Sequence, residues 1–266
     1  MISGYIALTK PRIIILLLIT ALGGLFLASA GPPNPSIALT VLVGGTLAAG
    51  GANAINHFLD RDIDEKMSRT RNRPIVSGVV QPKFALGFGI ILNILAFAIL
   101  AQWANLLSAL LTLSATLFYV FVYTIGLKRY TSQNIVVGGA PGAIPPMVGW
   151  VAVTGTVGLP AMYMFAIVFF WTPPHFWALA LLLKDDYARA GIPMLPVVAG
   201  IAETKKAIFL YAWLVAAVTV MFAASGSVGW VYLATSTILG AGFIWYSWGL
   251  LRKPDIEGAK SLYLYS

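Results

Sequence analysis

The sequence predicts an all-α polytopic membrane protein, built as a helical bundle of about eight transmembrane helices around a central cavity. Its 266 residues are 59% hydrophobic and only 10% charged, whereas soluble domains carry about 25% charged residues. Apolar runs of spanning length follow one another, separated by charged residues or by proline and glycine. We place these helices at residues 13–30, 37–59, 84–101, 106–127, 135–153, 161–183, 207–224 and 228–251.

The distribution of charge supports this topology. All 17 basic and all nine acidic residues fall in connections on the side that holds the N-terminus. Basic loops mark the cytoplasmic side of a membrane protein, so we predict that this side is cytoplasmic. The net charge of +8 would suggest nucleic acid binding in a soluble protein, but here it is spread over the loops, and we expect no nucleic acid partner.

The chain begins with MISGYIALTKPR and contains no cysteine. This beginning is neither a cleavable signal nor a long transit peptide, which predicts a prokaryotic inner membrane over an organelle. The absence of cysteine excludes disulfide and thiolate-metal chemistry. Lys10, Pro11 and Arg12 open the first predicted helix: the proline suits a helix start, and we interpret the two cations as topology signals.

The segment 56–73, NHFLDRDIDEKMSRTRNR, concentrates the charge of the chain, with four acidic and five basic residues. Asn56, Asp60 and Asp64 recur every four residues at the end of the second predicted helix, so a continued helix places their side chains on one face. Oxygen donors in this arrangement suit a hard cation such as Mg²⁺. An alternative is a solvated helix end whose charges pair only with one another.

Arg69, Arg71 and Arg73 follow these acids within the predicted cytoplasmic loop 60–83. Guanidinium groups are preferred partners of phosphates, and long loops in compact proteins are often functional. A metal site beside an anion site predicts that the segment binds a metal diphosphate.

Two later membrane segments are expected to have interrupted helices. Three glycines and three prolines fall within residues 138–146, and Pro173 and Pro174 precede His175 in the sixth predicted helix. Irregular backbone at membrane depth is tolerated where it lines a cavity. The alternatives are a kinked, closed helix in the first case and a structural, hydrogen-bonded histidine in the second.

A second charged cluster, Lys184, Asp185, Asp186 and Tyr187, opens the predicted cytoplasmic loop 184–206. It follows the sixth helix as the first cluster follows the second, which indicates two four-helix pseudo-repeats. An even number of helices separates the clusters, so both are expected on one side, facing across a cavity. Together they would hold two Mg²⁺ ions that bridge phosphate oxygens.

Several motifs, taken in order, resemble those of the UbiA-type intramembrane prenyltransferases, and within them the subgroup that farnesylates haem. The similarity runs from about Leu8 to Arg252. This sequence differs from the wider family in its second acidic motif, where the two aspartates, Asp185 and Asp186, are adjacent. The motifs are Asn56-x3-Asp60-x3-Asp64-x2-Met67-x-Arg69-Thr70-x2-Arg73-Pro74, the run from Leu127 to Pro146 that includes Lys128 and Arg129, Pro174-His175, Lys184-Asp185-Asp186-Tyr187 and Ile192-Pro193-Met194-Leu195-Pro196.

The resemblance implies transfer of a farnesyl group from farnesyl diphosphate to a vinyl group of haem B, with Mg²⁺ as cofactor and haem O as product for terminal oxidase assembly. It also implies nine membrane helices, so that 261–266 would begin a ninth, truncated helix of a single transmembrane domain spanning 1–266. Haem A synthase or oxidase assembly factors are the expected protein partners. Alternatives are another lipophilic acceptor, such as a quinone precursor or chlorophyllide, or a cation transporter.

The residues suggest a role for each part of this reaction. The catalytic set is Asn56, Asp60, Asp64, Lys128, Lys184 and Asp186. The metal ligands are Asn56, Asp60, Asp64, Asp185 and Asp186, and the diphosphate ligands are Arg69, Arg73, Lys128, Arg129 and Lys184. Tyr123, Trp177 and Tyr187 are the rings expected to stabilise an allylic cation, and His175 is the expected haem ligand.

Overall fold

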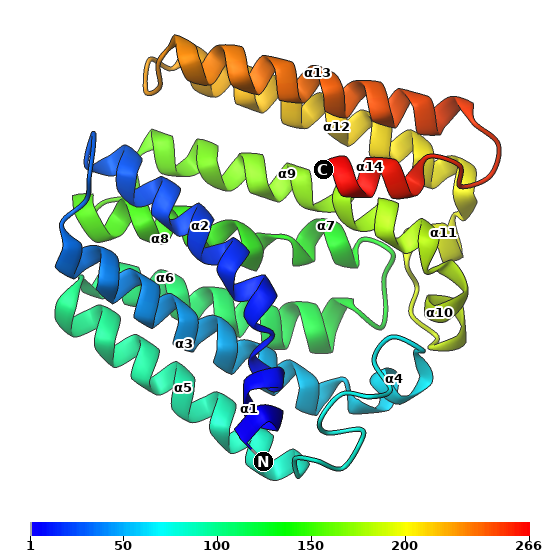
Figure 1. Cartoon of the computed structure of the whole chain (residues 1–266), viewed down its shortest axis with the longest axis horizontal. Coiled ribbons are helices and arrows are strands. Elements are labelled where there is room, and N and C mark those ends of the chain that lie inside the picture. Colours follow the sequence, from blue (N-terminus) through cyan, green and yellow to red (C-terminus); the bar gives the residue numbers. More distant parts are fainter. Residues whose placement is uncertain (1) are drawn as a thin grey trace. The chain divides into compact units, whose positions relative to one another are not determined.

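The structure, a computed structural model, describes residues 2–266, and all the regular secondary structure in that range is helical (Figure 1). The predicted all-α class is therefore confirmed. In chain order the elements are α1 (Ile2–Thr9), α2 (Pro11–Ala28), α3 (Pro35–Leu59), α4 (Arg61–Lys66), α5 (Pro82–Trp103), α6 (Leu106–Leu117), the π-helix η1 (Phe118–Leu127), α7 (Asn134–Gly138), α8 (Ala140–Thr154), α9 (Leu159–Leu182), α10 (Lys184–Arg189), α11 (Leu195–Val198), α12 (Gly200–Ala224), α13 (Trp230–Arg252) and α14 (Ala259–Tyr265).

Each of the eight predicted membrane segments is helical in the structure. Within residues 2–266, seven helical stretches are long and apolar enough to cross a membrane: Pro11–Ala28, Pro35–Leu59, Pro82–Trp103, Leu106–Leu127, Asn134–Thr154, Leu159–Leu182 and Gly200–Ala224. The eighth segment is α13, which has 23 residues but does not belong to these seven. Its serine, threonine, glycine and tyrosine residues lower its mean hydropathy, which explains the difference.

The starts of the long helices follow from local sequence. Pro11, Pro35 and Pro82 each stand in the first turn of a helix, where a missing backbone N–H costs no hydrogen bond. The side chain of Asn34 accepts a hydrogen bond from Ser36 N at the start of α3, and that of Asn105 accepts one from Ser108 N at the start of α6.

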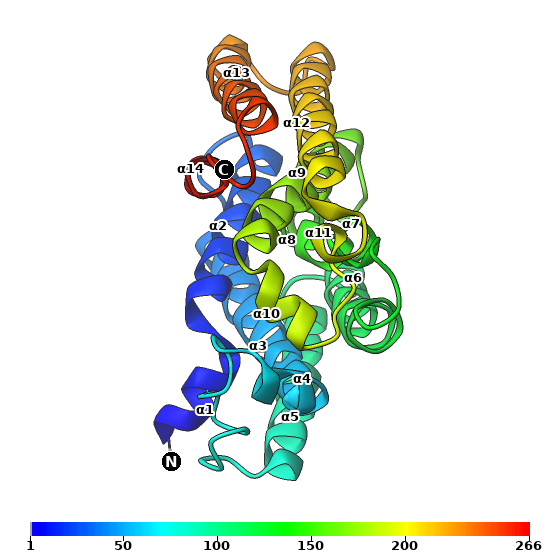
Figure 2. The ribbon, with the colours of Figure 1, turned by 90° about the vertical axis from the view of Figure 1, so that its right-hand side faces the viewer.

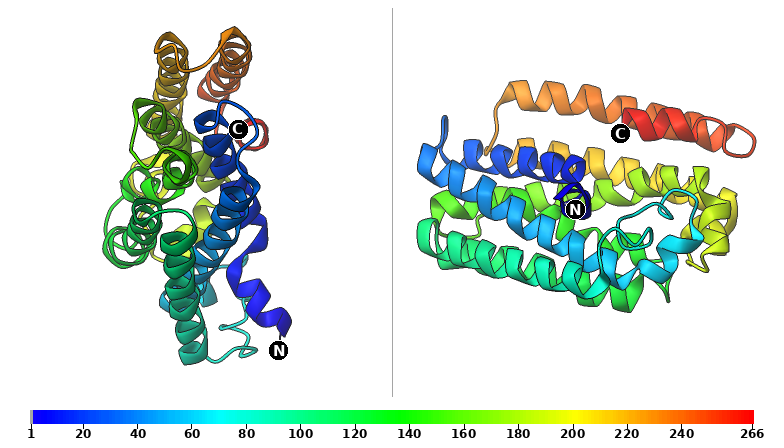
Figure 3. Two further views of the ribbon diagram at one scale, coloured as in Figure 1. Left: turned by 90° about the vertical axis from the view of Figure 1, so that its left-hand side faces the viewer. Right: turned by 60° about the horizontal axis from the view of Figure 1, so that its bottom comes forward.

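The chain forms two compact units, and the first comprises residues 2–126 with Ala140–Met162. In this unit α3 packs along α5, and α2 packs along α8 (Figure 3). The α3 and α5 backbones approach closely at Gly51 and Gly89, where a Cβ on Gly89 would lie 2.7 Å from the carbonyl oxygen of Gly51. Small residues let membrane helices pack at this distance, and the contact holds the helix that carries Asn56.

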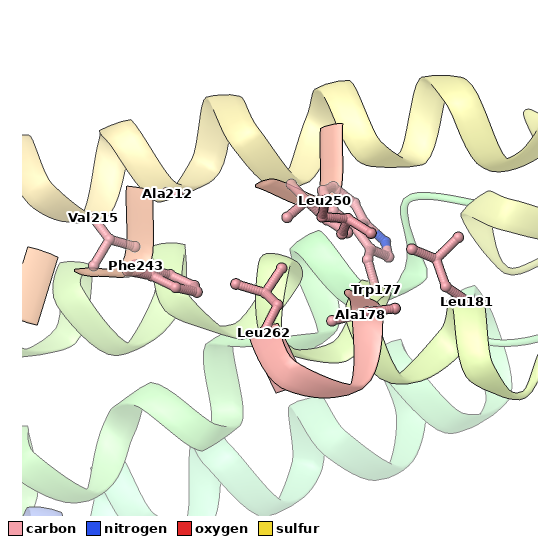
Figure 4. Packing of buried hydrophobic residues seen from close by; sticks show 10 residues of the cluster. Trp177, Ala178, Leu181, Ala212, Val215, Phe243, Leu250 and Leu262 are labelled. Carbon is pink, nitrogen blue, oxygen red and sulfur yellow. The ribbon is translucent and has the colours of Figure 1, made fainter. Parts of the chain in front are cut away.

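The second unit comprises Leu127–Gly139 with Tyr163–Ser266. Within it α12 and α13 lie side by side, and α14 packs against α13 (Figure 2). Its core joins one face each of α9, α12, α13 and α14 (Figure 4). The buried residues of this core include Trp177, Leu181, Ile208, Ala212, Phe243, Leu250 and Leu262.

Two local predictions of broken helices need correction. Helix α9 runs unbroken through Pro173 and Pro174, and the run 138–146 is interrupted only at Gly139, after which α8 contains Pro145 and Pro146. Proline removes an N–H donor but leaves the neighbouring turns intact, and membrane helices re-satisfy the freed groups locally.

The two predicted loops are also more ordered than expected. The first, 60–83, contains α4, a series of turns and the start of α5. The second, 184–206, contains α10 and α11, and α12 begins at Gly200 rather than at Ala207. Polar residues in the first turns of α12 hid this start from a search for apolar runs.

We predict that Gly89→Ala destabilises the first unit. The added methyl group would collide with backbone atoms of Gly51 and Ile55, and overpacking of this kind costs about 2 kcal/mol. The measurement is reversible unfolding in mixed detergent and SDS micelles, followed by circular dichroism. Gly87→Ala is the matched control on the same helix, because a Cβ there meets nothing within 4 Å. Equal stability of the two variants would contradict the close approach of α3 and α5.

Candidate functional site

The acidic segment lies where α3 ends and α4 begins. Asp60 N donates to Asn56 O at 2.9 Å, and Asp64 N donates to Asp60 O at 2.8 Å, so helical hydrogen bonds link the three residues at their four-residue spacing. Asn56, Asp60 and Asp64 are 3%, 0% and 2% exposed, whereas Asp62 and Glu65 are exposed. The three predicted residues therefore share one buried face, as their spacing predicted.

The amide of Asn56 is oriented by three contacts. Its Nδ2 donates to Asp60 Oδ2 at 2.6 Å and to Thr124 Oγ1 at 3.2 Å, while its Oδ1 accepts from Lys10 Nζ at 3.0 Å. The predicted row of three oxygens is wrong at this position, because Asn56 turns its nitrogen towards Asp60. A carboxylate accepts and does not donate, so the amide N–H group is the favourable neighbour.

Lys10 belongs to this site, although its sequence context indicated only topology. It separates α1 from α2 in a left-handed conformation, with φ 55° and ψ 64°, which is strained for a residue with a Cβ. The following Pro11 disfavours the helical conformation at Lys10 and so supplies the break. Asn53 Nδ2 fixes the same junction by donating to Thr9 O at 2.9 Å.

Asp64 is neutralised by an arginine from the same segment. Arg73 Nη1 lies 2.7 Å from both carboxylate oxygens of Asp64, and the Asp64 side chain is only 3% exposed. Thr70 Oγ1 donates to Asp64 O at 2.8 Å and closes the turn between them. Arg69 and Arg71 are exposed, so of the three predicted arginines, Arg73 is the one that contacts the acidic face.

The π-helix η1 brings a hydroxyl group to the acidic face. Thr124 is 1% exposed, accepts from Asn56 Nδ2, and donates to Tyr119 O at 2.8 Å. This five-residue step is the spacing of a π-helix, which often occurs at functional sites. Tyr123, a predicted cation-stabilising residue, is half-buried and stacks on Tyr119 with ring centroids 5.6 Å apart. Nothing in the apolar sequence of this span indicated the π-helix.

The second acidic cluster lies on α10, in the second unit. Asp186 is 6% exposed and pairs with Arg189, a contact that the sequence analysis missed, although the two residues stand three apart on a helix. Asp185 is exposed, Lys184 is half-buried and Tyr187 is buried. Asp185, the first acid of the predicted pair, is therefore a surface residue in this unit.

The remaining predicted residues of the second unit lie in different settings. Lys128 and Arg129 are half-buried in the turn after η1. Trp177 is 2% exposed within the core of α9, α12, α13 and α14 (Figure 4), and its ring packs edge-on against Tyr211 at 5.3 Å. This packing gives Trp177 a structural role, and we remove it from the set of cation-stabilising rings.

His175 lies on α9 within an aromatic cluster. Its ring centroid is 4.4 Å from that of Trp171 and 4.9 Å from that of Tyr263, and its Nδ1 lies 2.8 Å from Ser266 Oγ. Thr172 Oγ1 donates to Val168 O at 2.8 Å in the same stretch of helix, next to the prolines. The histidine is thus oriented by hydrogen bonding as well as by stacking.

The first-unit cluster has the chemistry of a Mg²⁺ site of low ligand number. Two buried carboxylates, those of Asp60 and Asp64, lie one helical turn apart where α3 ends and α4 begins. Among residues 2–266, no three His, Cys, Asp or Glu side chains form a group that could hold a metal ion. Mg²⁺ usually binds through one or two carboxylates and keeps waters or substrate phosphates as further ligands, so this donor set fits it.

Comparison with known proteins gives consistent results. A family model described as the UbiA prenyltransferase family matches residues 17–266. The chain is 54% identical to protoheme IX farnesyltransferase of a Nostoc species, over 100% of this chain and 84% of that protein. It is 50% identical to the protein of that name from Symbiobacterium thermophilum, over 100% of this chain and 89% of the relative.

Solved structures show the same fold at low sequence identity. The chain superposes on a digeranylgeranylglyceryl phosphate synthase with a TM-score of 0.82 and 20% identity, covering 99% of this chain and 92% of that one. It superposes on a UbiA homolog from Archaeoglobus fulgidus bound to DMAPP and Mg²⁺ with a TM-score of 0.78 and 17% identity, covering 98% and 97%.

We predict that Arg73→Gln lowers the free energy of unfolding by about 2 kcal/mol, because it leaves the buried Asp64 carboxylate without its guanidinium partner. Unfolding in mixed micelles measures the loss. Arg71→Gln is the control, since Arg71 is exposed in the same loop and its loss should cost under about 0.5 kcal/mol. Adding Asp64→Asn to Arg73→Gln should recover most of the stability, and a purely additive double variant would contradict the pairing.

Proposed function

The chain belongs to the UbiA prenyltransferase family, and from this premise we propose that it transfers the farnesyl group of farnesyl diphosphate to a vinyl group of haem B. The products are haem O and diphosphate. The observation that carries this proposal is identity of about one half, over the whole chain, to relatives named protoheme IX farnesyltransferase. The buried acidic face at the end of α3 supports it with the chemistry that a diphosphate leaving group requires.

Asp60 and Asp64 are the residues that would hold Mg²⁺ in this proposal. When bound, the ion would stabilise negative charge on the leaving diphosphate. Lys10 and Arg73 already contact this face, through Asn56 and Asp64 respectively, and they supply positive charge beside it. We include Lys10 among the proposed diphosphate ligands for this reason, together with Arg69, whose loop carries Arg73.

The proposed reaction replaces the bond between farnesyl and diphosphate by a bond between farnesyl and the haem vinyl group. The C–O bond of the farnesyl donor breaks, and its electron pair leaves with the diphosphate. The vinyl group of haem attacks the allylic cation and forms a carbon–carbon bond. Water then adds a hydroxyl group to the cation next to the porphyrin and releases one proton. The half-buried, stacked ring of Tyr123 is placed in the first unit, and we propose that it stabilises the allylic cation through its π face.

The second unit is proposed to bind haem through His175. Neutral imidazole is a common axial ligand of haem iron, and the aromatic rings around His175 offer apolar surfaces for stacking. Lys128, Arg129, Lys184, Asp185, Asp186 and Tyr187 belong to the same unit. Their proposed roles at the diphosphate, at a second metal ion and beside the allylic cation remain predictions from the sequence.

The seven apolar helices indicate a multi-pass membrane protein. We propose a prokaryotic inner membrane, with the N-terminus and the loops that carry the acidic clusters on the cytoplasmic side. The placement of every basic residue in or near the predicted connections of one side supports this orientation. Farnesyl diphosphate would then reach the acidic face from the cytoplasm.

The test of the function is incubation of purified protein with haem B, farnesyl diphosphate and Mg²⁺, followed by mass spectrometry of the porphyrin product. We expect a mass increase that corresponds to one farnesyl group and one hydroxyl group. Omission of Mg²⁺ with added chelator should stop the reaction. If no haem product forms and a quinone precursor is prenylated in a parallel incubation, the quinone precursor would replace haem as the proposed acceptor.

We predict that Asp60→Ala and Asp64→Ala each lower the rate roughly 100-fold or more, the scale of losing one charge-stabilising group. Glu65→Ala is the matched control: it removes an exposed acid from the same helix and should keep most of the wild-type rate. Binding of Mn²⁺ with inorganic pyrophosphate, read by electron paramagnetic resonance, should be lost in the first two variants. Normal Mn²⁺ binding in either would remove that residue from the metal site.

We predict that His175→Ala weakens binding of ferric haem B. The measurement is the Soret band during titration of detergent-solubilised protein with haem. Loss of an axial imidazole should shift the band and raise the dissociation constant. A band and an affinity identical to wild type would make His175 a structural residue.

A further inference from the structure

The hydroxyl group of Ser266 makes two contacts that together determine which ring nitrogen of His175 carries the proton. Ser266 Oγ lies 2.8 Å from Tyr263 O and 2.8 Å from His175 Nδ1. A serine hydroxyl carries one hydrogen, and a backbone carbonyl oxygen only accepts hydrogen bonds. The hydroxyl hydrogen therefore points to Tyr263 O, since two oxygens at this distance without a hydrogen between them would repel each other.

His175 must then be the donor in its contact with Ser266. The hydroxyl has given its hydrogen to Tyr263, so Oγ offers only a lone pair to the imidazole. Nδ1 carries a proton in this arrangement, and in a neutral imidazole the other nitrogen, Nε2, is left with a free lone pair. Metal-bound histidines show the same division, in which one nitrogen donates to an oxygen and the other binds the metal.

The geometry of this contact is held from several directions. Trp171 Nε1 donates to Ser266 O at 3.0 Å, so the serine is bound through its backbone as well as its side chain. The rings of Trp171 and Tyr263 lie within 5 Å of the imidazole centroid, at 4.4 and 4.9 Å. A 180° flip of the ring would place Cδ2 instead of Nδ1 beside Ser266 Oγ and would lose the hydrogen bond, so this contact fixes the orientation of the imidazole.

Helix α14, which ends at Tyr265 directly before the serine, is itself anchored in the second unit. Tyr265 Oη donates to Leu239 O of α13 at 2.8 Å, and Leu262 is 0% exposed in the core shared with α9. The serine whose hydroxyl faces His175 therefore directly follows a well-packed helix.

We propose that Ser266 positions His175 by holding its imidazole as the Nδ1–H tautomer, which makes Nε2 the nitrogen that binds the haem iron. This inference rests on the proposed function, because it assigns an atom to the proposed haem contact. Ser266 acts through His175 and is a positioning residue. Without its hydroxyl the imidazole would divide between two tautomers, and only the fraction with a free Nε2 would bind iron.

The first experiment reads the tautomer without haem and without activity. The full chain, labelled with ¹⁵N-histidine, is placed in lipid nanodiscs, and long-range ¹H–¹⁵N correlation spectra distinguish protonated from unprotonated ring nitrogens. The chain has two histidines, so the signals lost in His175→Gln are those of His175. We expect protonated Nδ1 and unprotonated Nε2 in wild type. Protonated Nε2 in wild type would overturn the proposal.

Variants at Ser266 separate its hydroxyl group from its bulk. Ser266→Ala should produce a mixture of tautomers or the opposite one, and Ser266→Thr, which keeps the hydroxyl, should restore Nδ1–H. Ser261→Ala is the matched control, because Ser261 is exposed on α14, which ends directly before Ser266, and its spectrum should equal that of wild type. A pure Nδ1–H signal in Ser266→Ala would show that another group sets the tautomer and would overturn the role of Ser266.

The second experiment is titration with ferric haem B, followed by its Soret band and by the low-temperature electron paramagnetic resonance of the iron. Ser266→Ala should raise the dissociation constant roughly three- to tenfold, the factor for one hydrogen bond, and Ser266→Thr should reverse the increase. Unchanged haem affinity in Ser266→Ala, with an altered tautomer, would overturn the link to iron. If His175→Ala also leaves haem binding unchanged, the haem assignment of the proposed function fails, whereas the tautomer is still decided by the first experiment.

Discussion

The first unit depends on how two negative charges are kept out of water at the end of an apolar helix. Asp60 and Asp64 are almost completely buried, and burial of a carboxylate is costly unless hydrogen bonds and opposite charges compensate for it. The structure supplies this compensation from several directions: the Asn56 amide, the Arg73 guanidinium, the Lys10 ammonium behind Asn56 and, through η1, Thr124. A binding site for a metal diphosphate needs the same balance of charge, so the residues that stabilise the buried carboxylates are also the residues that such a site requires.

Much of this organisation could be predicted from local sequence patterns. The four-residue spacing of Asn56, Asp60 and Asp64 predicted a shared face because the helical hydrogen bonds continue across the boundary of α3 and α4. Apolar runs of spanning length predicted the helices, since no other regular structure hides its backbone within one segment. The predicted eighth segment is helical over Trp230–Arg252, but it does not belong to the seven stretches that are apolar enough to cross a membrane.

The features that local sequence patterns did not predict depend on contacts between distant residues or on helix register. Lys10 and Asn56 are 46 residues apart, and Asn56 and Thr124 are 68 residues apart. The orientation of the Asn56 amide follows from these partners, so spacing alone placed an oxygen where a nitrogen lies. Trp177 was expected at a reactive cation because it is aromatic, but it fills the core of the second unit. Prolines in α9 were expected to break a helix that remains continuous.

The π-helix η1 has a mechanical consequence for the acidic face. A π-helix holds more residues per turn than an α-helix, and re-winding it to α geometry would rotate every later residue about the helix axis, by about 100° for each residue displaced. Thr124 would then swing off the Asn56 amide, and that amide would lose one of the two acceptors of its Nδ2. A substitution in η1 that restored α geometry would thus alter the hydrogen bonding of Asp60 from a distance, with no change to any charged residue.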